Sequence, residues 1–259
     1  MVVGIVSPGA MGSGFARALA AGGSRVVATV DGRGARTREL AAASAAEILD
    51  TLDDVVTAAG VILSVVPPAE ARATAAAIAA AATRRGVTPL VADLNATAPS
   101  TARAVAGDLA RAGLDTVDGS ISGPPPRPAG ETRIYLSGER AGEIAALRAP
   151  GIAWRVVGAE IGVASAVKMS TASVYKGTTA LLIQALVAAE ANGVLEVVVD
   201  DLRRGWPELA DGVSQRVQSG AAKSGRYVGE MHDPERLDPA LSLDDVVAAL
   251  RRRSGSVAG

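Results

Sequence analysis

The chain has 259 residues, of which 49% are hydrophobic, and a formal net charge of -1, which allows one large domain or two modest ones. Aromatic residues make up only 2% and there is no basic excess, so no nucleic-acid partner is predicted. The absence of cysteine and the single histidine, His232, exclude disulfides, thiol nucleophiles and zinc–thiolate sites, and no metal site is predicted.

The opening residues have the pattern of a strand, a turn and a helix. Val2–Val6 is a short apolar run, typical of a buried parallel strand, and Gly12–Ala21 reads as a helix. In a dinucleotide-binding unit Gly9 would let the backbone approach a pyrophosphate, and Gly12 would let helix and strand pack closely. The N-terminus of the helix would face the phosphates. One position departs from this pattern, because Ser7 stands where the glycine of the tight turn is expected.

Strands and helices alternate through the first half of the chain. Further strands are predicted at Val26–Val30, Val61–Val66, Leu90–Ala92, Thr116–Val117, Arg133–Leu136 and Gly151–Val157. Helices are predicted at Arg38–Ala46, Ala69–Ala82 and Pro99–Ala112. This alternation indicates an α/β fold with a doubly wound parallel sheet of the Rossmann type.

After Gly158 the strand signals fade, and a long helical stretch is predicted at Val163–Val199, broken near Gly193. Shorter helices are expected from there to Arg253. The sequence therefore predicts a dinucleotide-binding domain, residues 1–160, followed by an all-α C-terminal domain, residues 161–259.

Neither a signal peptide nor a membrane span is predicted. The chain opens with a strand instead of a charged segment and an apolar stretch. The most apolar helical region, Ala180–Val199, is interrupted by polar residues such as Glu190 and Asn192. We therefore expect a cytoplasmic protein with no membrane partner.

Three sets of motifs, in this order, carry a family resemblance. The first is Gly4–Leu19 (GIVSPGAMGSGFARAL), the second is Asp93–Pro99 (DLNATAP) with Asp118–Pro126 (DGSISGPPP), and the third is Gly162–Gly177 (GVASAVKMSTASVYKG). Together they resemble the β-hydroxyacid dehydrogenase superfamily, which includes 3-hydroxyisobutyrate and 6-phosphogluconate dehydrogenases. The residues of these motifs are most similar to those of a bacterial branch of NAD-binding 6-phosphogluconate dehydrogenase-like proteins.

The resemblance implies reversible hydride transfer between a nicotinamide and a hydroxyl or carbonyl carbon of a small, hydroxy acid-like substrate. It also implies a homodimer formed through the helical C-terminal domain. Two alternatives stay open. One is an imine reductase of the same architecture, although those enzymes usually have another residue where this chain has Lys168. The other is a non-catalytic NADP-binding sensor or scaffold.

Lys168 lies in an apolar helical stretch. From the residues alone, a lysine that extends to the surface is the favoured interpretation. The resemblance implies instead that Lys168 is the general acid/base, and burial would lower its pKa toward the working pH. The family's asparagine three or four residues further on is missing, and Thr171, Ser173 or Tyr175 could supply its hydrogen bond to the substrate.

Two loops after predicted strands complete the expected substrate site. Asn95 sits where the family commonly has a serine near the nicotinamide, although an asparagine after a strand is often only a turn residue. Ser122 and Gly123 match the family's substrate-binding pair. Both loops would face the crevice at the carboxyl ends of the parallel strands.

The end of the second strand bears on the choice of cofactor. Asp31 lies where an acid binds the ribose 2′-hydroxyl of NAD, whereas Arg33 and Arg36 can offer forked donors to the 2′-phosphate of NADP. NADP is preferred over NAD on this ground. The residues expected to bind the cofactor are Ser7, Gly9, Ala10, Met11, Gly12, Asp31, Arg33, Arg36, Val66, Pro67 and Asn95.

Overall fold

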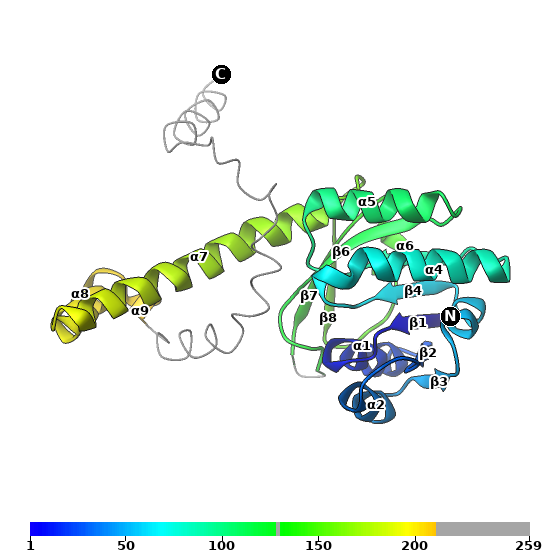
Figure 1. Cartoon of the computed structure of the whole chain (residues 1–259), viewed down its shortest axis with the longest axis horizontal. Helices are drawn as coiled ribbons and strands as arrows, with labels where there is room; N and C mark the ends of the chain where they lie inside the picture. The colour runs from blue at the N-terminus through cyan, green and yellow to red at the C-terminus, as the bar shows by residue number, and fades with distance from the viewer. Residues whose placement is uncertain (128–129, 211–259) are drawn as a thin grey trace, which may run out of the picture.

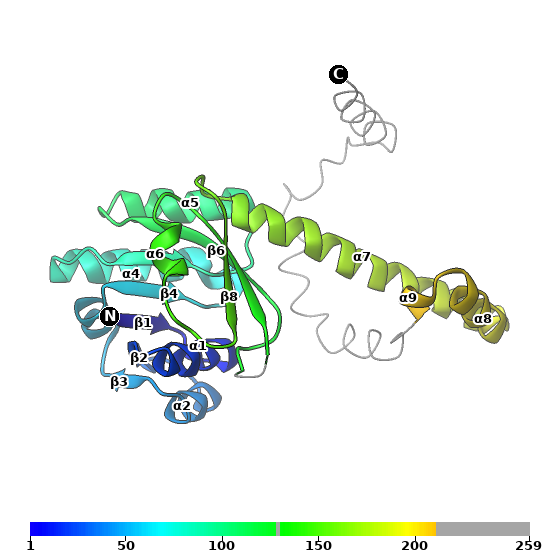
Figure 2. The same ribbon diagram turned by 180° about the vertical axis from the view of Figure 1, so that it is seen from behind.

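The structure is a computed structural model, and it describes residues 1–127 and 130–210. His232 and the helices predicted toward Arg253 lie outside these residues. The centre of the fold is one eight-stranded sheet with the strand order β3-β2-β1-β4-β5-β6-β7-β8. Helices cover both faces of this sheet, and one long helix, α7, leaves the body beside β6–β8 (Figures 1 and 2).

The strands and helices have the following bounds. The strands are β1 Val2–Val6, β2 Arg25–Thr29, β3 Glu47–Leu49, β4 Val61–Ser64, β5 Leu90–Asp93, β6 Thr116–Ser122, β7 Thr132–Ser137 and β8 Ile152–Gly158. The helices are α1 Ala10–Ala21, α2 Ala35–Ala42, α3 Leu52–Ala58, α4 Ala71–Arg85, α5 Pro99–Ala110, α6 Ala141–Ala145, α7 Val163–Ala191, α8 Leu195–Gly205 and α9 Pro207–Ala210, with a short 3-10 turn, η1, at Pro68–Glu70.

The core consists of two apolar layers because neighbouring residues of a strand point to opposite faces. On one face Ile5 and other strand residues pack with Phe15 of α1 and Ile144 of α6. On the other face Ile62 and its neighbours pack with α3, α4 and α5, where Ile78 is fully buried. The predicted Rossmann-type α/β fold is confirmed.

The sheet departs from the predicted parallel arrangement at one place. β7 pairs antiparallel with β6, whereas β8 returns parallel to β7. The physical reason is the connection: a parallel return needs a crossover, usually a helix. In the described part of the chain no helix lies between β6 and β7, whereas α6 lies between β7 and β8.

The region between β2 and β4 also differs from the prediction. The helix expected at Arg38–Ala46 ends at Ala42, and both β3 and α3 were missed. α3 begins with a capping box in which the Thr51 hydroxyl and the Asp54 carboxylate each bond the other's backbone N–H. This sequence signal could have located the helix.

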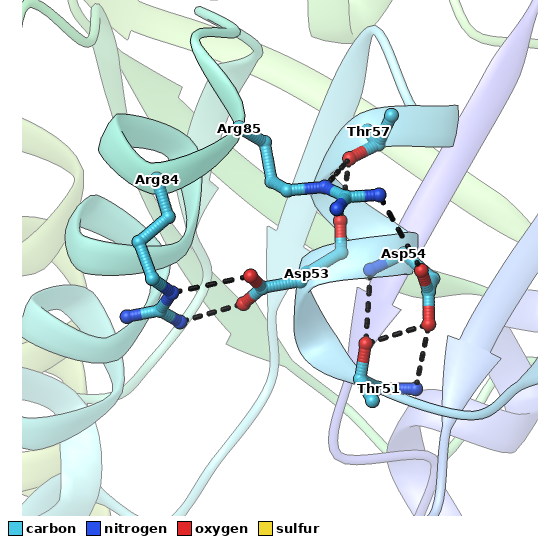
Figure 3. Close-up of polar contacts among 6 residues, drawn as sticks. All are labelled: Thr51, Asp53, Asp54, Thr57, Arg84 and Arg85. Atoms are coloured by element: carbon cyan, nitrogen blue, oxygen red, sulfur yellow. Dashed lines mark hydrogen bonds and ion pairs between the residues drawn. The ribbon is translucent and has the colours of Figure 1, made fainter.

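Ion pairs tie α3 to α4 (Figure 3). Arg84 contacts both carboxylate oxygens of Asp53, at 2.6 and 3.1 Å, and lowers the pKa of that carboxyl. Arg85 donates to the Thr57 hydroxyl at 3.1 Å and lies 3.8 Å from the Asp54 carboxylate. These contacts fix the outer helices at the edge of the sheet away from the ligand crevice described below.

The break predicted near Gly193 is confirmed. α7 ends at Ala191, and Gly193 adopts a φ of 68°, the left-handed conformation that ends many helices. Val194 N–H then donates to the Ala189 carbonyl at 2.9 Å before α8 begins.

Within the described residues, α7 is long and apolar enough to cross a membrane by length and composition alone, which is weak evidence for a span.

Candidate functional site

The carboxyl ends of the central strands form the edge on which the candidate site is built. Register partners run across the sheet from Val6 on β1 to Ser64 on β4, Asp93 on β5 and Asp118 on β6. β1 lies between β2 and β4, so the strand order reverses there. Such a switch point is where open α/β sheets bind their ligands.

The turn after β1 has the backbone shape of the glycine fingerprint despite its serine. Ser7 adopts a φ of 71°, and within the described residues it is the one non-glycine residue in that region. Gly9 is the N-cap of α1, and no side chain of the described residues caps this end. The first N–H groups of α1 are therefore available to an anionic ligand.

The glycines at this turn differ in their surroundings. A methyl group built at Gly12 would overlap the Ser7 carbonyl oxygen and lie 3.2 Å from the Ile5 side chain. Gly12 thus allows α1 to pack closely on β1, as predicted. At Gly9 the described residues leave open space, with nothing within 4 Å of such a methyl group. Ala10 and Met11 form the first turn of α1.

Asp31, Arg33 and Arg36 lie beside this turn, because β2 is the neighbour of β1. The Asp31 N–H donates to the Thr29 hydroxyl at 3.2 Å, and Gly32 has a φ of 66°. Asp31 and Arg36 are exposed and Arg33 is half-buried. In the part of the chain that the structure describes, none of the three forms an ion pair, so both guanidinium groups can meet an anion.

Asn95 is buried and joins two strand ends. Its carbonyl oxygen accepts from Val66 N–H at 2.7 Å, and its amide donates to the Ser64 hydroxyl at 3.0 Å and to the Asp93 carboxylate. The two N–H groups of the amide are thereby used inside the protein, and a ligand could bond only to the remaining lone pair of the oxygen. Pro67, next to Val66, is exposed at the same edge.

Asp93 and Asp118 place two carboxyl groups together beneath this edge. Both are buried, with relative exposures of 4% and 2%. Burial raises the pKa of Asp93 to about 7, and the charge of Asp118 adds to this rise, while hydrogen bonds from Asn95 and Ser64 oppose it. Such strongly perturbed carboxyls cluster at functional sites.

The first turn of α7 is anchored to the sheet by Asp118. One carboxylate oxygen of Asp118 accepts from the N–H groups of Gly162 and Ser165 at 2.9 and 3.1 Å, and the other accepts from the Ser165 hydroxyl at 2.7 Å. A carboxylate at a helix N-terminus also meets the positive end of the helix dipole.

Two serines add to this anchor. The Ser120 hydroxyl donates to the Ala164 carbonyl at 2.8 Å, and the Ser137 hydroxyl accepts from Ala164 N–H at 3.0 Å. The position of α7 relative to β6 and β7 is therefore fixed by hydrogen bonds and not by apolar packing alone.

Lys168 lies one helical turn beyond this anchored segment. Its side chain is half-buried, and burial lowers the pKa of its amine. No charged group among the described residues contributes to that shift. The amine is therefore neither freely solvated nor held in an ion pair, a state that suits proton transfer.

The other predicted substrate residues have different surroundings. The Thr171 hydroxyl donates to the carbonyls of Val167 and Lys168 at 3.0 and 3.1 Å, so its proton is used within the helix. Tyr175 is 72% exposed. Ser122 ends β6 on the same face as Asp118 and Ser120, because alternate residues of a strand share a face. It therefore lies toward α7.

Gly123 follows at the start of the loop with a φ of 131°. A cavity of about 380 Å³ opens between α5 and α7. Its lining includes Pro99, Arg103, Met169 and Ser170. Positions 166, 169, 170 and 173 of α7 share one helical face, and Lys168 projects from another. This cavity is therefore distinct from the space into which Lys168 projects.

Asp93 and Asp118, for which the sequence predicted no role, thus connect Asn95 with the first turn of α7, which precedes Lys168. Asp93 and Asp118 belong to the motifs given above, but the motifs assign no role to them or to Ser165. A carboxyl at the end of an apolar strand is a signal that a buried polar group needs partners. Its partners, however, come from distant parts of the chain.

Comparison with known proteins adds a family to this geometry. Residues 2–148 match the family described as the NAD binding domain of 6-phosphogluconate dehydrogenase. No match was found among curated proteins. Many solved structures are similar to this chain.

One similar structure is that of a conserved protein of unknown function, which itself resembles 3-hydroxyacid dehydrogenases. It is 28% identical, covers 93% of this chain and 91% of its own, and has a TM-score of 0.73. The 3-hydroxyisobutyrate dehydrogenase of Mycobacterium tuberculosis, solved with L-serine, is 21% identical with a TM-score of 0.61, over 79% of this chain and 70% of that one. An imine reductase from Myxococcus stipitatus, solved with NADP+, is 22% identical with a TM-score of 0.64, over 86% and 78%.

Proposed function

Because the chain belongs to the family of the NAD binding domain of 6-phosphogluconate dehydrogenase, and so to the NAD(P)-dependent oxidoreductases of the β-hydroxyacid dehydrogenase superfamily, we propose that Lys168 is its general acid/base. The reaction is hydride transfer between the nicotinamide and a hydroxyl or carbonyl carbon of a small, hydroxy acid-like substrate. One observation carries this proposal: burial lowers the pKa of the Lys168 amine. The helix that bears Lys168 is anchored to the carboxyl edge of the sheet.

The proton and the hydride move as follows. A bound nicotinamide would supply the hydride acceptor, while in the oxidative direction the neutral amine of Lys168 would take the substrate hydroxyl proton. In the reductive direction the ammonium returns that proton to the carbonyl oxygen as the hydride arrives. Burial lowers the pKa of Lys168, which is the direction that favours proton transfer by an amine.

The cofactor would lie across the turn after β1. Its pyrophosphate would meet the backbone at Gly9 and the first turn of α1. The unpaired Arg33 and Arg36 support NADP as the preferred cofactor, with Asp31 as the feature that favours NAD. Val66, Pro67 and Asn95 would lie along the nicotinamide half, and Ser122 and Gly123 along the substrate.

Two other functions compete with this one. The imine reductase fold is similar, and a cyclic imine would need the same hydride and a proton donor. A non-catalytic sensor would bind NADPH without turnover, and Ser7 and the missing asparagine after Lys168 are the features that favour it. A panel of hydroxy acids, keto acids and cyclic imines, assayed by NADPH absorbance, separates the three.

We expect Lys168→Ala to bind NADPH normally and to lose turnover on any substrate of that panel by about 10²- to 10⁴-fold, the range for a general acid/base. Lys176→Ala, which removes the other lysine of α7, is the matched control and should retain turnover. Turnover unchanged in Lys168→Ala would remove Lys168 from the mechanism.

A homodimer is the proposed assembly, formed by the helical part of the chain from residue 161 onward. Large apolar side chains on α7 and α8 are exposed, among them Val174, Leu181, Val187 and Val197, at 64–71%. α7 projects away from the sheet (Figure 1), so these side chains gain no cover from the body of the same subunit. Burial against a second copy would remove them from water.

A further inference from the structure

Two buried carboxyl groups meet where the sheet, the Asn95 loop and α7 join. Asp93 on β5 and Asp118 on β6 are register partners on neighbouring parallel strands, so their side chains lie side by side on one face of the sheet. Isolated charges are costly in such a position, and two adjacent carboxylates cannot both ionise easily.

Asp118 and Asp93 have different hydrogen-bond partners. Asp118 accepts four hydrogen bonds, from Ser137, from the N–H groups of Gly162 and Ser165, and from the Ser165 hydroxyl. All four donors belong to β7 or to the start of α7. Asp93 accepts from the Asn95 amide and has the Ser64 hydroxyl as its other polar neighbour.

Among the described residues no basic group contributes to the raised pKa of Asp93, and the Arg103 guanidinium of α5 approaches Gly162 at the start of α7. Asp118 is the charged group that bears on Asp93, whereas β4 presents Ser64 and the loop after β5 presents Asn95. α7 presents the Ser165 hydroxyl to the pair, and β7 presents the Ser137 hydroxyl. Lys168 contributes no charge interaction to either carboxyl.

We infer that Asp93 and Asp118 act as a positioning pair, in which a proton on Asp93 lets Asp118 hold the first turn of α7, and with it Lys168, against the sheet. Loss of that proton places two negative charges side by side. The repulsion weakens the Asp118 contacts to α7 and the Asn95 contact to Val66 together. The consequence for Lys168 rests on the proposed function, whereas the hydrogen bonds at α7 can be followed without it.

The sign of the pH dependence follows from the raised pKa of Asp93. The ordinary pKa of this carboxyl is 3.8 and its value in the folded protein is about 7. Between these values the folded chain binds more protons than the unfolded chain, so this group lowers stability as pH rises from about 4 to about 7. Above pH 7 the penalty is complete and constant.

The test is amide hydrogen exchange of Gly162 and Ser165 in the full chain between pH 6 and 8.5, corrected for the intrinsic exchange rate. In the wild type, the protection factors of these two N–H groups should fall as the pH rises to about 7, by up to about ten-fold per pH unit, the limit for linkage to one proton, and should level off above pH 7. Asp93→Asn keeps an acceptor and a donor without the charge, so its protection factors should not change with pH, and its Tm at pH 8 should exceed that of the wild type.

Asp115→Asn is the matched control, because this carboxyl is 67% exposed and pairs with Arg140; it should behave as the wild type. Ser165→Ala removes one donor to Asp118 and should lower protection at every pH. The inference is overturned if wild-type protection is constant with pH, or if Asp93→Asn retains the wild-type dependence.

A titration with NADPH on the same samples separates this inference from the proposed function. If NADPH fails to bind while the exchange results hold, the proposed function fails and the positioning pair stands. If NADPH binds but exchange at Gly162 and Ser165 does not change with pH, the positioning pair fails and the proposed function stands.

Discussion

At the scale of single residues, Ser7 shows how a departure from a motif can preserve its shape. Its φ of 71° is the left-handed conformation that glycine adopts freely and other residues adopt at a cost of about 1–2 kcal/mol. The backbone of the turn therefore matches the fingerprint although the side chain does not.

We expect Ser7→Gly to leave the free energy of unfolding within about 1 kcal/mol of the wild type, because relief of strain is offset by greater freedom in the unfolded chain. Ser7→Val should destabilise the protein by about 1–2 kcal/mol, since a β-branched residue fits this conformation poorly. Urea denaturation measures both. Equal stability of the two variants would contradict the strained turn.

The cofactor preference is also argued from single residues. Arg33→Ala should weaken NADPH binding by about 10- to 100-fold, the loss of one charge-assisted hydrogen-bonded contact, and leave NADH binding nearly unchanged. Arg25→Ala, at the opposite end of β2, is the control and pairs only with Glu47 at the far edge. Fluorescence titration with both cofactors decides the matter, and tighter wild-type binding of NADH would overturn the NADP preference.

At the scale of elements, the contact of α1 with β1 separates the roles of two glycines. Gly12→Ala should destabilise the protein by about 1–3 kcal/mol, as overpacking does, because the new methyl meets the Ser7 carbonyl. Gly9→Ala has open space around it and should fold normally, yet its methyl would occupy the approach of the pyrophosphate. In thermal unfolding Gly12→Ala should therefore have the lower Tm of the two variants. In an NADPH titration Gly9→Ala should bind the cofactor more weakly.

The elements that were predicted correctly share a simple pattern. β1, β4 and β5 are short apolar runs, and α5 begins with a proline at its first position. β3 was missed because its three residues are mostly exposed and show no apolar run. For α3 the signal was present, in the capping box at Thr51, and was not used.

At the scale of the whole molecule, the exposed side chains of α7 predict the assembly. Leu181→Glu should shift the protein from dimer to monomer, because it places a charge in the proposed apolar interface. Ala77→Glu, at an exposed position of α4, adds the same charge away from α7; it is the control and should leave the dimer intact. Analytical ultracentrifugation reports the mass of each, and a monomeric wild type would contradict the proposal.

The sequence by itself determined the order and type of most elements, the Rossmann-type fold and the family. Hydrophobic periodicity, glycines and helix starts are local signals that need no knowledge of distant residues. The resemblance then supplied Lys168, Asn95 and Ser122 as candidate site residues.

Only the tertiary structure decided how these residues are held. Asp118 and Ser165 are 47 residues apart in the chain yet share a hydrogen bond of 2.7 Å. Asp93 acquires its raised pKa from burial and from a strand that follows a whole helix later. The antiparallel direction of β7 is likewise defined only by its pairing with β6. Each of these properties arises from contacts between distant segments, and no local pattern in the sequence encodes them.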